Sequence, residues 1–470
     1  MAWLRRALAL TAGAALLLGA SGTAHADPAP SVTGPVTGGT HGHPFGSLAA
    51  RPSPIDLNAA GYTEAEYFVT GTARAFTPGG PLGSDGRWSA HPAAAAPYTT
   101  RVLVERPKDA RRFNGTVVVE WLNVSAAAET PPDLAYAHRE LLRDGYAWAG
   151  VSAQQLGVTG SPYSLKAWDP VRYGPLSHPG DSFSYDIFTQ VGAALRHPRG
   201  ARPLGGLPVR RLIADGESQS ASRMTTYVNA FARGGTPYDG YLIHSRGAGS
   251  APLSQAPQPA ADPPGTVFIR TDLRRPVLQF QTETELTALG YLPARQPDTA
   301  RLRTWEAAGT SHVDRATLDD ILAMQRRDLP EYPAPVCDRP VNDGQERYLM
   351  GQAVRALTRW SAGGPAPARA PRIAVTAGTI SRDANGNARG GVRTPAVDAP
   401  LATLTGDGNT PAGWCTLFGT STPLPRGRYP SKAAYLAQVA RAAFSAARHG
   451  YIDPRDIPRI LRESGAAWPG

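Results

Sequence analysis

The segment from Leu212 to Met224 reads LIADGESQSASRM and constrains the fold more than any other part of the chain. Its aliphatic start, with Leu212 and Ile213, predicts a buried strand that breaks at Gly216. After Ser218, the residues Ala, Met, Thr and Val recur at helical spacing. The segment therefore predicts a strand that turns sharply into a helix, with the hydroxyl of Ser218 at the apex of the turn.

Apolar runs of strand length alternate with helical patterns on both sides of this segment. Further strands are predicted at 115–122, 146–151, 240–244, 276–280 and 302–307. Helices are predicted at 134–142 and 181–195, and the helix after Ser218 is expected to end at about residue 231. This alternation predicts a mostly parallel sheet with right-handed crossovers. Two earlier segments, 67–73 and 100–105, alternate with the period of half-buried strands, so an antiparallel pair is expected at the N-terminal edge.

The first 26 residues have the pattern of an export signal. Arg5 and Arg6 precede an apolar run that ends at Leu18, and the small residues after it end in Ala24-His25-Ala26. Because the run is shorter than the ~20 residues that span a bilayer, it predicts cleavage after Ala26 and secretion rather than anchoring. No later stretch reaches that length either, so no integral membrane contact is expected.

Composition then divides the mature chain. Residues 27–60 are rich in Pro, Gly, Ser and Thr and form a leader, and residues 61–330 hold the alternating strand and helix pattern of the core. Residues 331–470 are more loosely patterned, with helices expected at 342–360 and 431–450 and a short strand at 373–375. This last part is interpreted as an appendage packed on the core.

The two cysteines of the chain, Cys337 and Cys415, both lie in the appendage. An exported protein passes into an oxidising compartment, so they are predicted to form a disulfide, with two free buried thiols as the alternative. Two cysteines cannot build a Cys-rich zinc site, and the sequence contains no HExxH motif. No metal is therefore implied.

The net charge of +10 invites a nucleic-acid interpretation, but its distribution argues against one. Lys108, Lys166 and Lys432 are the only lysines among 470 residues, and the arginines are scattered along the chain. A nucleic-acid-binding surface usually shows basic runs with interleaved aromatic residues, and none is present. The charge is interpreted as scattered and solvated.

Ser218 needs partners to act chemically, because a serine hydroxyl is a poor nucleophile at neutral pH without a base and an acid that orients the base. His312 lies in the small-residue loop of WEAAGTSH beyond the last predicted strand, and it is the candidate base. Glu285 and Glu283 follow the strand before it, in LQFQTETE, with Asp298 as a third candidate acid. The alternative for these carboxylates is solvated charge at a helix N-terminus.

Six strings, in chain order, resemble a group of large α/β-hydrolase domain-containing proteins, over roughly residue 62 to the C-terminus. They are EWLNVS, GYAWAGVSAQ, HPGDSFSYDIF, GESQSASRM, LQFQTETEL and WEAAGTSH. The resemblance implies Ser218 as nucleophile, His312 as base and a carboxylate of TETE as acid. The chain departs from the family pattern twice: Ser220 replaces the last glycine of G-x-S-x-G, and Glu285 stands where aspartate is common.

The resemblance also implies an α/β-hydrolase fold, with a mostly parallel central sheet flanked by helices. By analogy, the oxyanion hole combines the backbone N–H of Gln219 with that of Asn123 or Val124. His244 and Arg246 follow the strand after the nucleophile helix and could line the pocket or lie at the surface.

The expected function is that of a secreted serine hydrolase that cleaves small-molecule or polymeric carboxylic esters through an acyl-enzyme, without a cofactor. The alternatives are an amidase or peptidase that uses the same residues, and a non-catalytic binding protein on a hydrolase scaffold.

Overall fold

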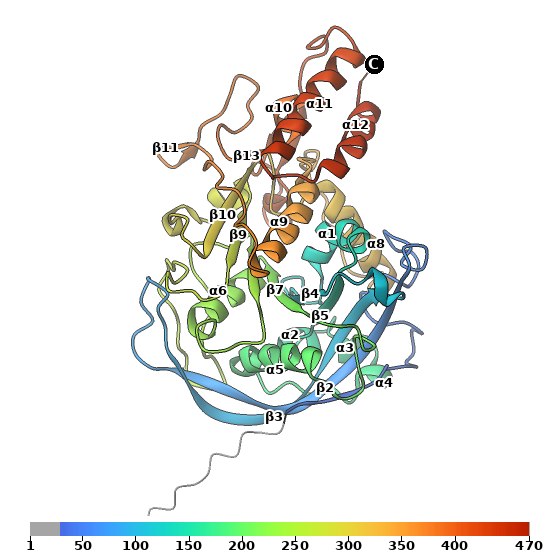
Figure 1. Cartoon of the computed structure of the whole chain (residues 1–470), viewed down its shortest axis with the longest axis vertical. Helices are drawn as coiled ribbons and strands as arrows, with labels where there is room; N and C mark the ends of the chain where they lie inside the picture. Colours follow the sequence, from blue (N-terminus) through green and yellow to red (C-terminus); the bar gives the residue numbers. More distant parts are fainter. Residues whose placement is uncertain (1–28, 470) are drawn as a thin grey trace, which may run out of the picture.

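The computed structural model describes residues 29–469, so the predicted export signal and its cleavage site lie outside the described residues. Eleven of the described strands form one sheet (Figure 1), in the spatial order β13-β10-β9-β8-β7-β4-β5-β3-β2-β1-β6. They are β1 (Ser31–Thr33), β2 (Tyr62–Pro78), β3 (Ala90–Pro107), β4 (Thr116–Trp121), β5 (Ala147–Val151), β6 (Arg199–Gly200), β7 (Arg211–Glu217), β8 (Gly240–His244), β9 (Val277–Gln281), β10 (Leu302–Ala308) and β13 (Val392–Arg393).

The centre of the sheet is parallel, as predicted. Strands β5, β4, β7, β8, β9 and β10 pair side by side in the same direction. Strand β3 runs antiparallel to β5, and β2 runs antiparallel to β3, which confirms the predicted antiparallel edge. Both edge strands are longer than predicted, because pairing with β2 keeps the Ala-rich start of β3 extended despite its low β-propensity.

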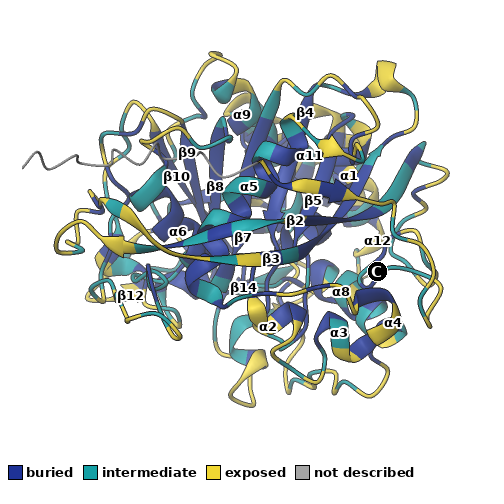
Figure 2. Cartoon of the chain, turned by 90° about the horizontal axis from the view of Figure 1, so that it is seen from below, coloured by how far each residue is buried: buried dark blue, intermediate teal, exposed yellow. Residues whose placement is uncertain are grey.

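Helices cover both faces of the parallel centre of the sheet, whereas the start of β3 is exposed. The longer ones are α1 (Pro132–Arg143), α5 (Ser184–Arg196), α6 (Gln219–Phe231), α8 (Arg315–Asp328), α9 (Glu346–Ser361), α11 (Lys432–Arg448) and α12 (Ile457–Ala466). Alternate residues of β4 enter different cores: Val117 and Val119 pack with α5 and α6, while Val118 packs with α1 and α9. Because the central strands are buried on both faces (Figure 2), their sequences are nearly continuous apolar runs.

Short elements complete the described chain. The short helices are α2 (Gln155–Val158), α3 (Leu165–Trp168), α4 (Pro170–Tyr173), α7 (Glu283–Leu286) and α10 (Pro395–Asp398), and the short strands are β11 (Val375–Thr376), β12 (Thr379–Ile380), β14 (Ala402–Thr405) and β15 (Thr420–Pro423). Single 3-10 turns lie at Ala110–Arg112, Asp181–Phe183, Leu292–Ala294, Trp414–Leu417 and Pro454–Asp456. Within residues 29–469, no helix combines the length and the apolarity that crossing a membrane requires.

Strand pairing joins the segment after residue 330 to the core, and a disulfide links two parts of the segment to each other. Its strand β13 extends the central sheet by pairing in parallel with β10. Cys337 and Cys415 form a disulfide, as predicted. Because that bond closes a loop between residues 78 apart, the chain-entropy model gives it about 4.5 kcal/mol of stabilisation.

The C-terminal segment differs from its prediction at two places. The helix expected from residue 342 begins only at Glu346, because Gln345 adopts a left-handed backbone with φ of 63°. The strand expected at 373–375 is reduced to a bridge between Ile373 and Gly390, followed by β11. Helix α8, immediately after the His312 loop, was not predicted at all.

Candidate active site

Ser218 stands at the turn between β7 and α6, in a backbone conformation that few residues other than glycine adopt. Its φ is 59° and its ψ is −117°. The turn is tight enough that a Cβ on Gly216 would lie 3.0 Å from the carbonyl oxygen of Ser220. Ser220 itself is fully buried, so a small residue is needed at the place where the sequence departs from the usual glycine. The strained turn lifts the Ser218 hydroxyl out of the sheet.

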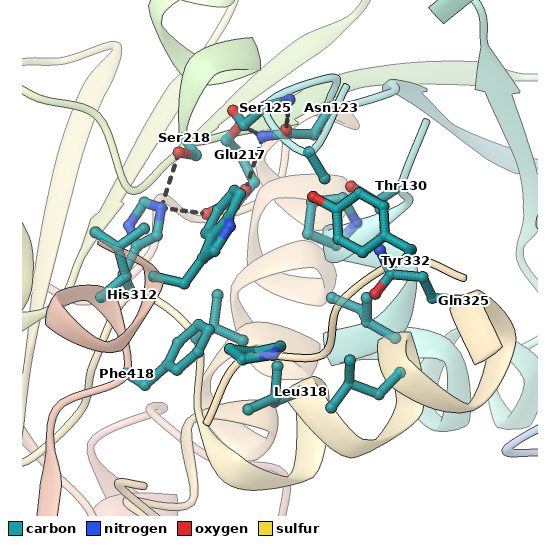
Figure 3. A pocket seen from close by; sticks show the side chains of 18 residues that line it. Asn123, Ser125, Thr130, Glu217, Ser218, His312, Leu318, Gln325, Tyr332 and Phe418 are labelled. Atoms are coloured by element: carbon teal, nitrogen blue, oxygen red, sulfur yellow. Dashed lines mark hydrogen bonds and ion pairs between the residues drawn. The ribbon is translucent and has the colours of Figure 1, made fainter. Parts of the chain in front are cut away.

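His312 reaches this hydroxyl from the loop after β10. Its Nε2 lies 2.8 Å from Ser218 Oγ, within hydrogen-bond distance (Figure 3). Three further contacts hold the loop: the backbone N–H of His312 donates to Thr284 Oγ1, its carbonyl accepts from the Tyr136 hydroxyl at 3.0 Å, and its Nδ1 contacts Glu285. The imidazole is therefore held between the hydroxyl and a carboxylate.

Glu285 is the carboxylate on the far side of the ring, with its Oε1 2.7 Å from His312 Nδ1. Its other oxygen, Oε2, accepts hydrogen bonds from the backbone N–H and the hydroxyl of Thr282, in a capping box that starts α7. Burial alone would raise the pKa of Glu285, but the hydrogen bonds and charge of His312 together with Thr282 hold it below its ordinary value. Glu285 is thus kept ionised beside the imidazole.

Glu283, two residues earlier, faces away from the imidazole. Its Oε1 accepts the backbone N–H of Gly309 at 2.6 Å, and its Oε2 lies 3.1 Å from the guanidinium of Arg382. The third candidate, Asp298, pairs with Arg372 at 3.0 Å. Of the three carboxylates considered from the sequence, the structure brings only Glu285 to His312.

A second carboxylate, which the sequence did not single out as functional, approaches the other side of the ring. Glu217 precedes Ser218, and its Oε1 lies 3.0 Å from His312 Nε2. Its Oε2 accepts a hydrogen bond from the side-chain amide of Asn123 at 3.2 Å. Burial raises the pKa of Glu217 to about 7. The only sequence signal was its place next to the serine, at the end of a buried strand.

The two positions considered for the second oxyanion donor are not equivalent. The backbone N–H of Asn123 donates to the carbonyl of Thr130 at 3.0 Å, so this amide is already engaged. The side chain of Asn123 holds Glu217 and the backbone N–H of Ser125 instead. Val124 thus stays the predicted second donor beside Gln219, whose N–H is the first of α6 and has no carbonyl of its own helix to bond.

A cavity of about 140 Å³ lies beside Ser218 and His312. Helix α8 contributes Leu318, Ile321 and Leu322 to its lining, and the C-terminal segment contributes Trp414 and Phe418. Leu318 and Phe418 lie on the same side of the cavity in Figure 3 and pack in one apolar cluster. Sequence reasoning missed this lining. The regular apolar spacing from Leu318 to Leu322 after Asp314, which caps α8, was the available signal.

His244 and Arg246 do not line this cavity, contrary to one of the two placements considered, and they are not at the surface either. His244 is fully buried between Asp133, 2.7 Å away, and Glu346, 3.2 Å away. Arg246 is buried against the carbonyl of Val267 and the side chain of Gln279. Both side chains tie together the segments behind the site. Among residues 29–469, no group of three or more His, Cys, Asp or Glu side chains could hold a metal ion.

Comparison with known proteins agrees with the class that this sheet order and strand-turn-helix serine define, the α/β-hydrolase fold. A family model described as "Alpha/beta hydrolase domain" matches residues 32–462, and the chain belongs to this family. No curated protein matches the chain.

Several solved structures are similar to the chain at low identity. XC6422 from Xanthomonas campestris, an α/β serine hydrolase without a lid, shares 14% identity over 56% of this chain and 97% of its own, with a TM-score of 0.29. A glucuronoyl esterase from Solibacter usitatus shares 12% over 61% and 88%, with a TM-score of 0.25. An α/β serine hydrolase homologue from Coxiella burnetii shares 10% over 50% and 93%, with a TM-score of 0.28.

Proposed function

We propose that this chain is an exported serine hydrolase that cleaves carboxylic esters through an acyl-enzyme. The observation that carries the proposal is the continuous chain of contacts from Ser218 Oγ through the imidazole of His312 to the carboxylate of Glu285, with distances of 2.8 and 2.7 Å. This arrangement supplies a nucleophile, a general base in hydrogen-bond reach and an acid that fixes the base.

Acylation begins when Ser218 Oγ attacks the ester carbonyl carbon and its proton passes to His312 Nε2. The negative charge that forms on the carbonyl oxygen is stabilised by the backbone N–H groups of Gln219 and Val124. The bond to the alcohol oxygen then breaks, and the alcohol leaves with the proton from Nε2. Glu285 stabilises the imidazolium throughout by its hydrogen bond to Nδ1.

Deacylation repeats the same steps with water. A water molecule gives one proton to His312 Nε2 and attacks the acyl carbon, and Ser218 Oγ then leaves and recovers that proton. The products are the free carboxylic acid and the resting enzyme.

Export is the second part of the proposal. It is supported by Arg5 and Arg6, by the short apolar run after them and by the Ala24-His25-Ala26 site. A disulfide between Cys337 and Cys415 suits an oxidising compartment.

Ester cleavage is favoured over amide cleavage because the cavity beside Ser218 is lined mainly by apolar side chains. Only a minority of the lining side chains are polar, and an amide N–H that leaves water without finding one of them costs ~1–3 kcal/mol. We expect turnover of ethyl butyrate but none of N-ethylbutyramide above the background of a Ser218→Ala variant, measured as butyrate released. Comparable butyrate release from both compounds would favour the amidase alternative. No release from either by folded protein would favour the binding-protein alternative.

A further inference from the structure

The cavity beside Ser218 is closed on several sides and nearly free of charge. Leu318, Leu322 and Phe418 are buried in its wall. Of the residues that line it, all within the described part of the chain, none is Lys or Arg, and Glu217 and His312 belong to the catalytic cluster. A negatively charged substrate group would find no cation there, and burying it unpaired would be costly.

The volume of the cavity indicates the size of the group that it can enclose. At about 140 Å³, it is close to the ~150 Å³ engineered apolar cavity that binds benzene. A group of roughly six carbon atoms would therefore fill it. Longer groups would have to leave through the mouth, past Trp414.

The disulfide joins the two parts of the C-terminal segment that contribute Pro335 and Trp414 to the cavity. Val336 and Trp414 each precede one of its cysteines, and both are exposed, at 82% and 41%. Cys415 and Phe418 pack with Leu318 and Leu322 of α8 in one apolar cluster. The cavity is therefore a built part of the fold, and the disulfide links its two rim segments.

We propose that this cavity binds one compact, uncharged apolar group of the ester, of about six carbons, on either its acyl or its alcohol side. This inference rests on the proposed esterase function and names its substrate class. Each methylene that leaves water for the cavity should raise kcat/KM about fourfold until the cavity is full.

The test is a series of p-nitrophenyl esters from acetate to decanoate, with a parallel series of alkyl acetates from ethyl to decyl. We expect kcat/KM to rise on the order of 10²-fold from two to six carbons in one of the two series and then to level off. The p-nitrophenyl monoester of adipic acid, as long as the hexanoate but with a terminal carboxylate, should be a poor substrate.

Two variants place the effect in the cavity. Leu322→Trp fills it and should remove the gain at six carbons, so that kcat/KM for the hexanoate no longer exceeds that for the acetate. Leu156→Trp, at an exposed position of α2, should keep the wild-type chain-length preference. A flat series, equal turnover of the adipate monoester, or a Leu322→Trp variant with unchanged chain-length preference would overturn the cavity proposal alone. Loss of all ester turnover in the wild-type protein would instead overturn the proposed function.

A second inference starts from the carboxylate of Glu217. The hydrogen bond of His312 Nε2 is directed at Ser218 Oγ, and Glu217 Oε1 lies beside the same nitrogen, 3.0 Å away, without a hydrogen-bond partner of its own among the described residues. A buried carboxylate oxygen without a partner costs free energy, so the position needs a reason.

An electrostatic role explains the position of Glu217. Coulomb attraction between its carboxylate and a protonated His312 does not require the alignment that a hydrogen bond requires. When His312 takes the Ser218 proton, it becomes a cation between two carboxylates, Glu285 at Nδ1 and Glu217 near Nε2. Burial lowers the pKa of His312, but the charge of Glu217 and the hydrogen bond and charge of Glu285 raise it above its ordinary value overall.

The other groups around Glu217 come from four elements. They are His312 after β10, His244 in β8, Asp133 and Tyr136 in α1, and Glu285 in α7. His312 and His244 favour its charged form, while Asp133 and Glu285 oppose it.

We propose that Glu217 is a positioning residue that stabilises the imidazolium of His312 and thereby sets the lower pH limit of the proposed reaction. In the resting enzyme, the same charge makes His312 harder to deprotonate. Replacing Glu217 by glutamine should therefore move the acid limb of kcat/KM to lower pH by at least about one unit, and lower the plateau kcat.

The measurement is the pH profile of p-nitrophenyl acetate hydrolysis for wild type, Glu217→Gln, Glu217→Asp and Glu346→Gln. Glu346 is an equally buried carboxylate, but it contacts His244 rather than His312, so its variant should keep the acid limb in place. Glu217→Asp keeps the negative charge, so its acid limb should lie between those of the wild type and Glu217→Gln. A purely structural role would lower activity at every pH and leave the limb unmoved, and that result would overturn this inference but not the proposed function.

Discussion

Replacing Ser218 by alanine is expected to reduce p-nitrophenyl ester turnover by at least about 10⁴-fold, because the acyl-enzyme can no longer form. The residual rate would come from binding and the oxyanion donors alone. The substitution removes one oxygen atom from a half-buried side chain, so the thermal unfolding temperature should stay close to that of the wild type. Labelling by a fluorophosphonate probe should disappear together with the activity.

The matched control is Ser222→Ala, one turn along α6 from the apex. Its backbone N–H bonds the carbonyl of Ser218, and its hydroxyl does not line the cavity. This variant should keep both turnover and labelling. Wild-type turnover in folded Ser218→Ala would exclude the proposed mechanism. A folded wild-type protein that neither reacts with the probe nor hydrolyses any ester would favour a binding function on the same scaffold.

The second large effect is expected at Glu285. Glu285→Gln retains the size of the side chain and an oxygen for the capping box with Thr282, but it removes the charge that stabilises the imidazolium and can present an amide to Nδ1. A loss of roughly 10³ to 10⁴-fold in kcat is expected, because the comparable change in serine proteases leaves the histidine in the wrong tautomer. The measurement is kcat for p-nitrophenyl acetate at the plateau of the pH profile.

Glu283→Gln is the matched control, two residues away on the same short helix. Glu283 holds the backbone of Gly309 and pairs with Arg382, so its variant should lower the unfolding temperature while the folded protein keeps its kcat. The reverse pattern, with activity lost in Glu283→Gln and kept in Glu285→Gln, would contradict the assignment of the acid.

The sequence could not decide whether Glu283 or Glu285 contacts His312, because the decision depends on local geometry. Both follow β9 within a few residues, and both are acids in the first turn of α7. Which one faces His312 depends on the angle at which this turn leaves the sheet and on the loop after β10, where Gly309 takes a positive φ of 71°. Neither quantity can be derived from residue spacing.

The same limit explains the missed cavity. Trp414 and Phe418 lie about 200 residues beyond Ser218 in the chain. They line the site because strand β13 attaches the C-terminal segment to the core, while the disulfide ties two parts of that segment together. Glu217 was overlooked for a related reason. A charged residue in a buried strand can point to either side of the sheet, and only the position of His312 makes its charge relevant.

By itself, the sequence determined the parallel sheet, the antiparallel edge and the serine at the apex of a strand-turn-helix, because these depend on periodicity and turn chemistry within short segments. It also determined the disulfide pair, because the chain has only two cysteines. Tertiary structure alone decided which carboxylate contacts His312 and which side chains enclose the space beside Ser218. Those contacts join separate loops at one edge of the sheet, and their geometry depends on the packing of the whole molecule.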